Sequence, residues 1–261
     1  MQKIINHTAT LFGKKNILLK TLPFVIGIVV LKYVVHMFGL EFMELNALFT
    51  SFVAANVFLL GFLMAGVLTD FKESEKLPGE LSVSLESIAD EAHSLYKTKK
   101  LKEAMECVEH VRSLIACLKK WFHKDERTRE VFKHLTELNP FFSAFEPHTQ
   151  ANFIVRLKQE QANIRRIVTR IDAIRDTSFI ASGYRIAEVN SILLIIGLIA
   201  LKLDPFANAL FLAGSVSLLF LYMMFLIKDL DDPFGFHRTD SFENVSIKAI
   251  EDVEERLQNY N

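Results

Sequence analysis

The chain has 261 residues, of which 51% are hydrophobic and 23% are charged, and its formal net charge is −1. So many apolar side chains beside so many charges indicate membrane-spanning segments joined to a water-facing part, rather than an ordinary soluble domain. The near-neutral charge, with no aromatic and basic platform, excludes a broadly basic nucleic-acid binder, so no nucleic-acid partner is expected.

The N-terminal segment, residues 1–16, contains three lysines and no small-residue cleavage site after its first apolar run. We therefore do not expect a removable signal peptide. Residues 17–40 form the first apolar segment, whose lysines can extend their ammonium groups towards the membrane surface. The short connection that follows contains Glu41 and Glu44 but no Lys or Arg. By the positive-inside rule, the N-terminus is expected in the cytoplasm and this connection outside.

The next segment carries no formal charge over residues 45–69 and then meets a densely charged stretch at Asp70. About 20 apolar residues, rising about 1.5 Å each, are enough to cross a bilayer, so this segment predicts a second span. Within it, Ala54, Phe58 and Phe62 recur every four residues. On a helix they would form one narrow stripe, which can face lipid, another helix or a pore.

Residues 70–185 are charged and helix-periodic, which predicts a water-facing helical domain. Apolar residues recur every three or four positions in two amphipathic segments, 81–95 and 101–118. A third, shorter helix is expected to stop at Pro140, because the residue before a proline disfavours the helical conformation. A fourth helix is expected from Pro147, as a long strut of about 30 residues.

Carboxylates and histidines in this domain are of the type that di-metal helical bundles use. They are Glu106, Glu109, His110, Glu130 and His134. Such bundles use Glu-x-x-His pairs, whereas in both pairs found here the histidine follows the glutamate one position too late. We therefore expect these side chains to lie on solvated helix faces, and no metal site is predicted.

The sequence predicts no enzymatic activity. It has neither a Ser-His-Asp elbow nor a Gly-rich nucleotide loop. The spacing of Cys107 and Cys117 fits neither a metal-binding pair nor a disulfide framework. We interpret them as reduced thiols on a cytoplasmic helix.

Two further apolar segments follow the charged domain. Residues 187–203 lead to a tight turn at Asp204-Pro205, and residues 205–227 then contain no charge. They predict a membrane hairpin whose end returns to the cytoplasm, so that both termini lie inside. The expected fold is an all-α membrane protein with a cytoplasmic N-terminal segment (1–16), two spans (17–69), a cytoplasmic helical domain (70–185), two spans (186–228) and a cytoplasmic C-terminal segment (229–261).

One motif in the second span resembles a known family. The block FLLGF at residues 58–62 is followed by Val67 and Thr69, and then by Leu77-Pro78 after the charged run. The order and spacing of these residues resemble the second transmembrane helix of bestrophins, and four spans split around a helical domain resemble their layout. Bestrophins are pentameric anion channels. A chain of this length resembles the prokaryotic members of the family.

The resemblance implies a homopentamer around one pore, conducting chloride or other small anions, with membrane lipid as its other partner. Ala54, Phe58 and Phe62 would form the hydrophobic neck, with Ala54 making one end wider. A ring of Phe side chains repels water, while each ring edge carries a partial positive charge that an incompletely hydrated anion can pass. Large, weakly hydrated anions should then permeate better than chloride.

A second motif, DDPFG at residues 231–235, resembles the turn that opens a calcium clasp in animal bestrophins. His237 and Arg238 stand where that family has acids, so Asp232 and Asp240 would be the remaining ligands. Calcium takes about six to eight oxygen ligands, which this set does not supply. We expect a structural turn here rather than a calcium sensor, and no cofactor.

Two other classes of protein stay open. The chain could be a non-conducting, membrane-anchored helical scaffold or signalling protein, or a small transporter, although no internal repeat is visible. The number of copies in the assembly separates the channel from both. The expected location is a bacterial inner membrane, because the chain is short and carries no targeting segment.

Overall fold

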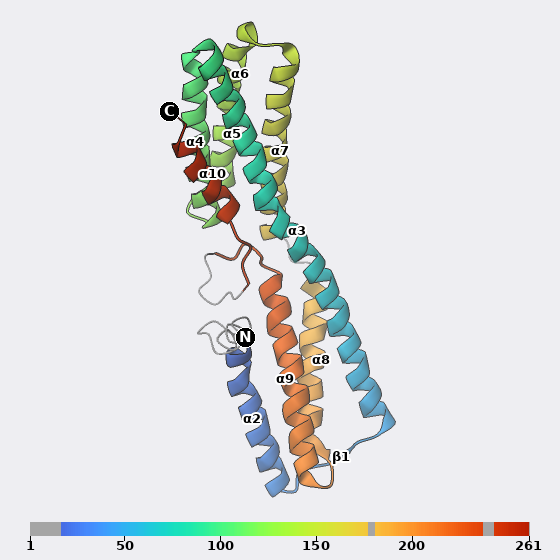
Figure 1. Cartoon of the computed structure of the whole chain (residues 1–261). Coiled ribbons are helices and arrows are strands. Elements are labelled where there is room, and N and C mark those ends of the chain that lie inside the picture. Colours follow the sequence, from blue (N-terminus) through green and yellow to red (C-terminus); the bar gives the residue numbers. More distant parts are fainter. Residues whose placement is uncertain (1–16, 177–180, 237–242, 261) are drawn as a thin grey trace, which may run out of the picture. The chain divides into compact units, whose positions relative to one another are not determined.

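The computed structural model describes the chain apart from residues 1–16, 177–180, 237–242 and 261. In chain order its elements are α2 (Ile17–Met37), β1 (Met43–Glu44), α3 (Ala47–Lys99), α4 (Lys102–Phe122), α5 (Thr128–Thr136), α6 (Leu138–Phe145), the 3₁₀ helix η1 (Glu146–His148), α7 (Ala151–Asp176), α8 (Ala181–Ala200), β2 (Leu201–Lys202), α9 (Phe206–Leu230) and α10 (Lys248–Gln258) (Figure 1). They form two compact units. The first comprises Met1–Asp70, Ser178–Asp232 and Asp240–Glu243, and the second comprises Phe71–Thr177, Pro233–Thr239 and Asn244–Asn261.

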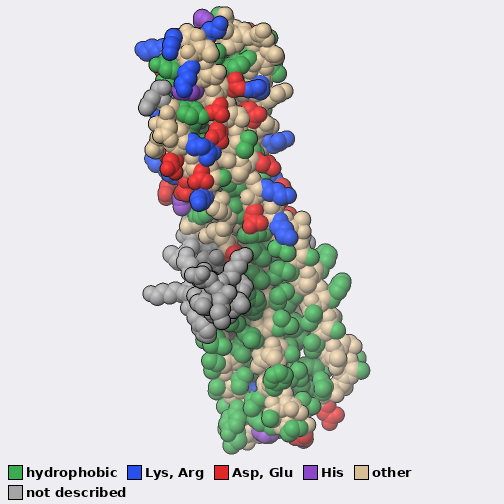
Figure 2. All heavy atoms as spheres, in the orientation of Figure 1, with side chains coloured by type: hydrophobic (Ala, Val, Ile, Leu, Met, Phe, Trp, Pro, Cys, Tyr) green, Lys and Arg blue, Asp and Glu red, His purple; other side chains and the backbone are tan. Residues whose placement is uncertain are grey.

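The first unit contains the helices that are long and apolar enough to cross a membrane: α2, the first part of α3, α8 and α9. Within it, α2 packs mostly against α9 and also against α8, and α8 packs against α9 (Figure 1). Much of the surface of these helices remains exposed and apolar, as expected of helices surrounded by lipid. Figure 2 shows that hydrophobic side chains predominate on the visible surface of this unit.

A short parallel pairing connects two loops at one end of the first unit. Met43 of β1 lies opposite Leu201 of β2, and Glu44 lies opposite Lys202. The N–H group of Phe42 extends the pairing by donating to the carbonyl of Ala200, with an N to O distance of 3.1 Å. The connection after α2 is therefore joined to the end of α8.

The second unit is a helical bundle with a charged surface and an apolar core. The visible surface of this unit carries lysine, arginine, aspartate and glutamate side chains (Figure 2). α4 packs against α5, α6 and α10, and α5 packs against α7. Trp121, Phe122, Phe142 and Phe145 are buried in the core. The amphipathic pattern predicted for this region is confirmed in α4, whose buried residues fall on one face.

The helix α3 contains both the second predicted span and the predicted amphipathic segment 81–95. It is one helix of 53 residues, and Pro78 lies inside it. A proline inside a helix removes a hydrogen bond and costs about 3 kcal/mol. Leu77 and Leu81 on either side of it are buried, and this packing keeps the helix continuous where helix propensity alone would end it.

Pro140 was predicted to end a helix, but it does not. The preceding helix, α5, ends at Thr136, and Pro140 lies in the first turn of α6. There its missing N–H group costs nothing, because the first turn of a helix has no internal acceptors for its N–H groups. The fourth predicted helix begins at Ala151, after η1, and α7 has 26 residues.

Candidate functional site

The residues predicted to form the neck lie on the first part of α3. Ala54 is exposed, and the side chains of Phe58 and Phe62 are 77% and 59% exposed. Their spacing of four residues places all three on one face of the helix. Beside them, Gly61 has no atom within 4 Å of the position that a Cβ would occupy. In the described part of the chain, more than half of each aromatic side chain thus remains uncovered.

The other face of this part of α3 is packed. Leu60, Leu63 and Val67 are at most 3% exposed. Near the start of α3, the ring of Phe49 lies so close to Gly197 of α8 that a Cβ there would be 2.8 Å from it. These residues mark the buried face of α3, and Phe58 and Phe62 lie on the opposite face.

Asn56 is the buried polar residue in the apolar part of α3, residues 47–69. Its side-chain amide donates to the carbonyl of Phe52, one turn earlier in α3, at 2.9 Å. A polar side chain in an apolar helix can satisfy itself on the preceding turn in this way. Asn56 therefore plays no part in the exposed aromatic stripe.

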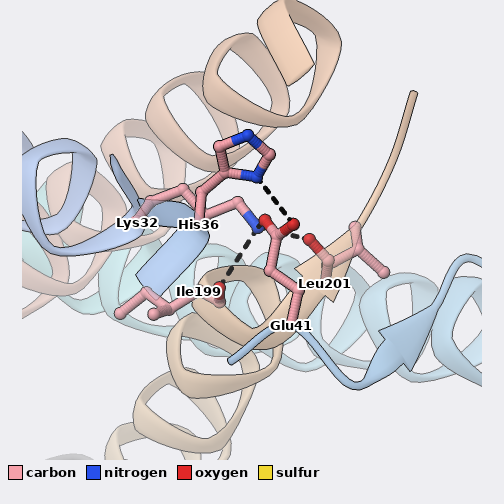
Figure 3. A network of polar contacts seen from close by, with 5 residues as sticks. All are labelled: Lys32, His36, Glu41, Ile199 and Leu201. Atoms are coloured by element: carbon pink, nitrogen blue, oxygen red, sulfur yellow. Dashed lines mark hydrogen bonds and ion pairs between the residues drawn. The ribbon is translucent and has the colours of Figure 1, made fainter. Parts of the chain in front are cut away.

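A charged network lies at the end of the first unit where β1 and β2 pair (Figure 3). Lys32 of α2 is fully buried, and its ammonium group bonds to the carboxylate of Glu41 and to the carbonyls of Ile199 and Leu201. His36 Nδ1 lies 2.9 Å from the second oxygen of Glu41. Three acceptors match the three donors of a lysine ammonium group, so the buried charge is fully satisfied.

The electrostatics of this network favour the ionised carboxylate. Burial of Glu41 opposes its ionisation, but the hydrogen bonds from Lys32 and His36 outweigh burial, and the pKa of Glu41 lies below its ordinary value. The ring of His36 stacks on Phe206 of α9 with centroids 3.7 Å apart. The network thus connects α2, the loop after it, α8 and the start of α9.

Around the DDPFG turn, the described residues are held by hydrogen bonds and packing. The carboxylate of Asp229 accepts from the N–H of Glu243, and Asp231 accepts from the hydroxyl of Tyr184, both at 2.8 Å. Phe234 is buried and packs against Phe122. Of the two candidate calcium ligands, Asp232 is half-buried, and Asp240 lies outside the described residues.

The histidines predicted to lie on solvated faces are placed differently. His110 of α4 and His134 of α5 are half-buried and face one another, and Glu137 joins them. The search for Glu-x-x-His pairs missed this cluster because its local motif has the reverse order, His134-x-x-Glu137.

Cys107 and Cys117 are free and buried on α4, and burial raises the pKa of Cys107 to about 12, which keeps its thiol protonated.

No protein-family model matches the chain, and no curated protein sequence matches it significantly. Solved structures do match it. A bestrophin homologue from Klebsiella pneumoniae with a single substitution superposes with a TM-score of 0.76 over 94% of this chain and 98% of that one, at 14% identity. This chain has the bestrophin fold. A second structure of the Klebsiella homologue gives a TM-score of 0.71 at 14% identity over 94% and 97% of the two chains, and a further variant gives 0.73 at 15% over 92% and 98%.

The bestrophin fold agrees with the architecture expected from the sequence, an all-α membrane protein. The match covers almost the whole of both chains, so it includes the apolar helices and the water-facing bundle together. At 14% identity the likeness concerns the course of the backbone. The assignment of individual side chains in this bestrophin-like chain therefore depends on its own geometry, above all on the exposed aromatic face of α3.

Proposed function

We propose that this chain forms an anion channel in which Phe58 and Phe62 line the narrowest part of the pore and Ala54 lies at its wider end. The observation that carries the proposal is the exposure of both rings on a helix whose other face is buried at Leu60, Leu63 and Val67. The bestrophin fold supports it, because the matching structures are of bestrophin homologues, and bestrophins form anion channels.

The pore needs several copies of the chain. One chain contributes a single aromatic stripe, which forms a wall but not a ring. Closed cyclic symmetry repeats the stripe around an axis, and we propose a homopentamer, as in the family that the chain resembles. Membrane lipid would cover the outward apolar faces of α2, α8 and α9.

The apolar, aromatic character of this stripe would determine which ions pass. No formal charge lies in the span between Glu44 and Asp70, so the constriction would be apolar. Phe rings exclude water from a narrow pore, and their edges carry a partial positive charge. An anion that loses water easily can pass close to those edges, whereas a strongly hydrated cation is repelled. Iodide and nitrate should therefore permeate better than chloride.

The proposed channel needs no cofactor and no enzymatic step. We also propose that it conducts without calcium. Carboxylates near the DDPFG turn already accept protein hydrogen bonds, as Asp229 and Asp231 do. With both termini in the cytoplasm, the bundle of the second unit would face the same compartment. The proposed location is a bacterial inner membrane.

Planar-bilayer recording of the purified protein tests the function. Wild-type protein should pass anion current, and the double substitution Phe58→Ala with Phe62→Ala should raise the conductance and bring the iodide to chloride permeability ratio closer to one. The matched control is Phe211→Ala on α9, a ring that is 76% exposed in the chain but is not part of the stripe.

Two results would contradict the proposal. The first is wild-type protein that passes no anion current after verified insertion, which would favour the scaffold alternative. The second is a double variant with the conductance and ion preference of wild type, or a Phe211→Ala control that changes them equally. Either form of the second result would show that Phe58 and Phe62 do not line the pore.

A further inference from the structure

Three side chains of the kinds that bind metal ions lie close together on the second unit, in a cluster that the proposed channel does not use. His110 comes from α4, His134 comes from α5, and Glu137 is the residue that caps the end of α5. One ring nitrogen of each histidine and a carboxylate oxygen of Glu137 all lie within 4.8 Å of one another. The helices that carry them pack directly against each other, so the backbone holds the three groups in place.

The distance between His134 and Glu137 is close to that between two ligands of one zinc ion. His134 Nδ1 lies 3.7 Å from Glu137 Oε2, which is too long for a hydrogen bond. In a tetrahedral zinc site with metal-ligand bonds of about 2.0 to 2.2 Å, neighbouring ligand atoms are roughly 3.4 Å apart. An ion between these two atoms would therefore need only a small movement of the exposed Glu137 side chain.

The nitrogen that faces Glu137 has no hydrogen-bond partner. His134 Nδ1 is a buried atom, and it is among the few such side-chain atoms left unsatisfied in the described part of the chain. A buried polar atom without a partner is costly, and nearly all such atoms in proteins are satisfied. A coordinated metal ion would remove this cost.

The third ligand is already oriented. His110 Nε2 donates to the backbone carbonyl of His134 at 2.8 Å, and the ring of Phe141 packs beside it with centroids 5.5 Å apart. Metal-binding histidines usually donate one ring N–H to a carbonyl or carboxylate, which fixes the ring and leaves the other nitrogen with its lone pair. In His110 the acceptor is a carbonyl of the opposing helix, so Nδ1 is the nitrogen that would bind the ion.

We propose that His110, His134 and Glu137 bind one divalent transition-metal ion of the zinc type, which links α4 to the end of α5. Two imidazoles and one carboxylate select zinc-like ions over calcium and magnesium, which prefer oxygen ligands throughout. The side chains of His134 and Glu137 are 30% and 46% exposed, so the ion enters from solvent and keeps a position for water.

Zinc titration of the full-length protein in detergent, after treatment with a chelator, tests the site. We expect one saturable zinc ion per chain, measured by competition with a chromogenic chelator. Glu137→Gln should weaken binding at least about tenfold, the effect that loss of even an outer-shell partner has. His134→Ala should abolish binding. His148→Ala is the control, because His148 is an exposed histidine of η1 in the same unit, and it should bind as wild type does.

Cobalt gives a second readout. Its visible absorption should change on binding to wild type and to His148→Ala, only at higher cobalt concentration with Glu137→Gln, and not with His134→Ala. The inference is overturned if wild type shows no saturable zinc binding, or if Glu137→Gln binds zinc as tightly as wild type. Glu137→Gln changes a partly exposed side chain without changing its shape, so it tests the site even if His134→Ala fails to fold. Circular dichroism and gel filtration report the fold of each variant.

Discussion

Lys32 shows how a charged residue can lie inside an apolar helix. Its sequence position suggested a side chain that reaches the membrane surface, but the ammonium group is fully buried and bonds to Glu41 and two carbonyls at the end of α8. An unpaired charge in such a place would be very costly, so the lysine stays only because every donor has an acceptor. Lys32 therefore connects α2 to α8.

Replacing Lys32 tests this role. Lys32→Met would leave the Glu41 carboxylate and the Ile199 and Leu201 carbonyls without their donor, and we expect a loss of about 3 kcal/mol in the free energy of unfolding. Thermal unfolding in detergent measures it as a lower midpoint. Lys202→Met is the control, since Lys202 is exposed and takes part through its backbone. Equal midpoints for the two variants would refute the role of the network.

Among the elements, the apolar spans could be predicted because their signal is local. α2, α8 and α9 are apolar on nearly every side, and composition and length alone identify such helices. The continuity of α3 through Pro78 could not be predicted, since it depends on packing around Leu77 and Leu81. The stripe of Phe58 and Phe62 could be found from its spacing, but only the structure shows that no other part of the described chain covers it.

The histidine cluster shows the same limit. His134 and Glu137 are close in sequence, but His110 comes from a different helix, and only the packing of α4 against α5 brings it to them. A motif search fixed on one order of residues could not find it. The Lys32 network also depends on tertiary packing. Two of its acceptors, the carbonyls of Ile199 and Leu201, lie at the end of α8 and in β2, far from Lys32 in the sequence.

The helix α10 gives a prediction at the scale of elements. The sequence indicated only a C-terminal segment there, yet Ile250, Val253 and Leu257 of α10 are fully buried, and Glu254 pairs with Lys119 of α4 at 2.7 Å. Val253→Asp would place a carboxylate in this apolar contact. We expect α10 to detach, with a cost of about 3 kcal/mol to the second unit.

Limited proteolysis measures the detachment as faster cleavage of the C-terminal segment, and thermal unfolding measures the cost. Gln258→Asp adds the same charge on an exposed position of α10 and should behave as wild type. If Val253→Asp resists the protease as well as Gln258→Asp does, the contact of α10 with α4 does not hold the helix.

At the scale of the whole molecule, the first unit leaves large apolar side chains exposed on α2, α3, α8 and α9. Lipid can cover those on the outside of an assembly. In the proposed channel, the pore must exclude lipid. There the aromatic stripe of α3 and the outward faces of the other helices would need different surroundings, which a ring of copies around an axis would provide.

The mass of the purified assembly tests this arrangement. Native mass spectrometry from detergent should give five times the 29.9 kDa of one chain. The Phe58→Ala and Phe62→Ala double variant should keep that mass, because an aromatic ring facing an open pore contributes little to contacts between copies. If conduction changes while the mass does not, the two rings affect the pore and not the association of the copies. A monomer or dimer of the wild-type chain would contradict the pore, since one or two stripes cannot surround an axis.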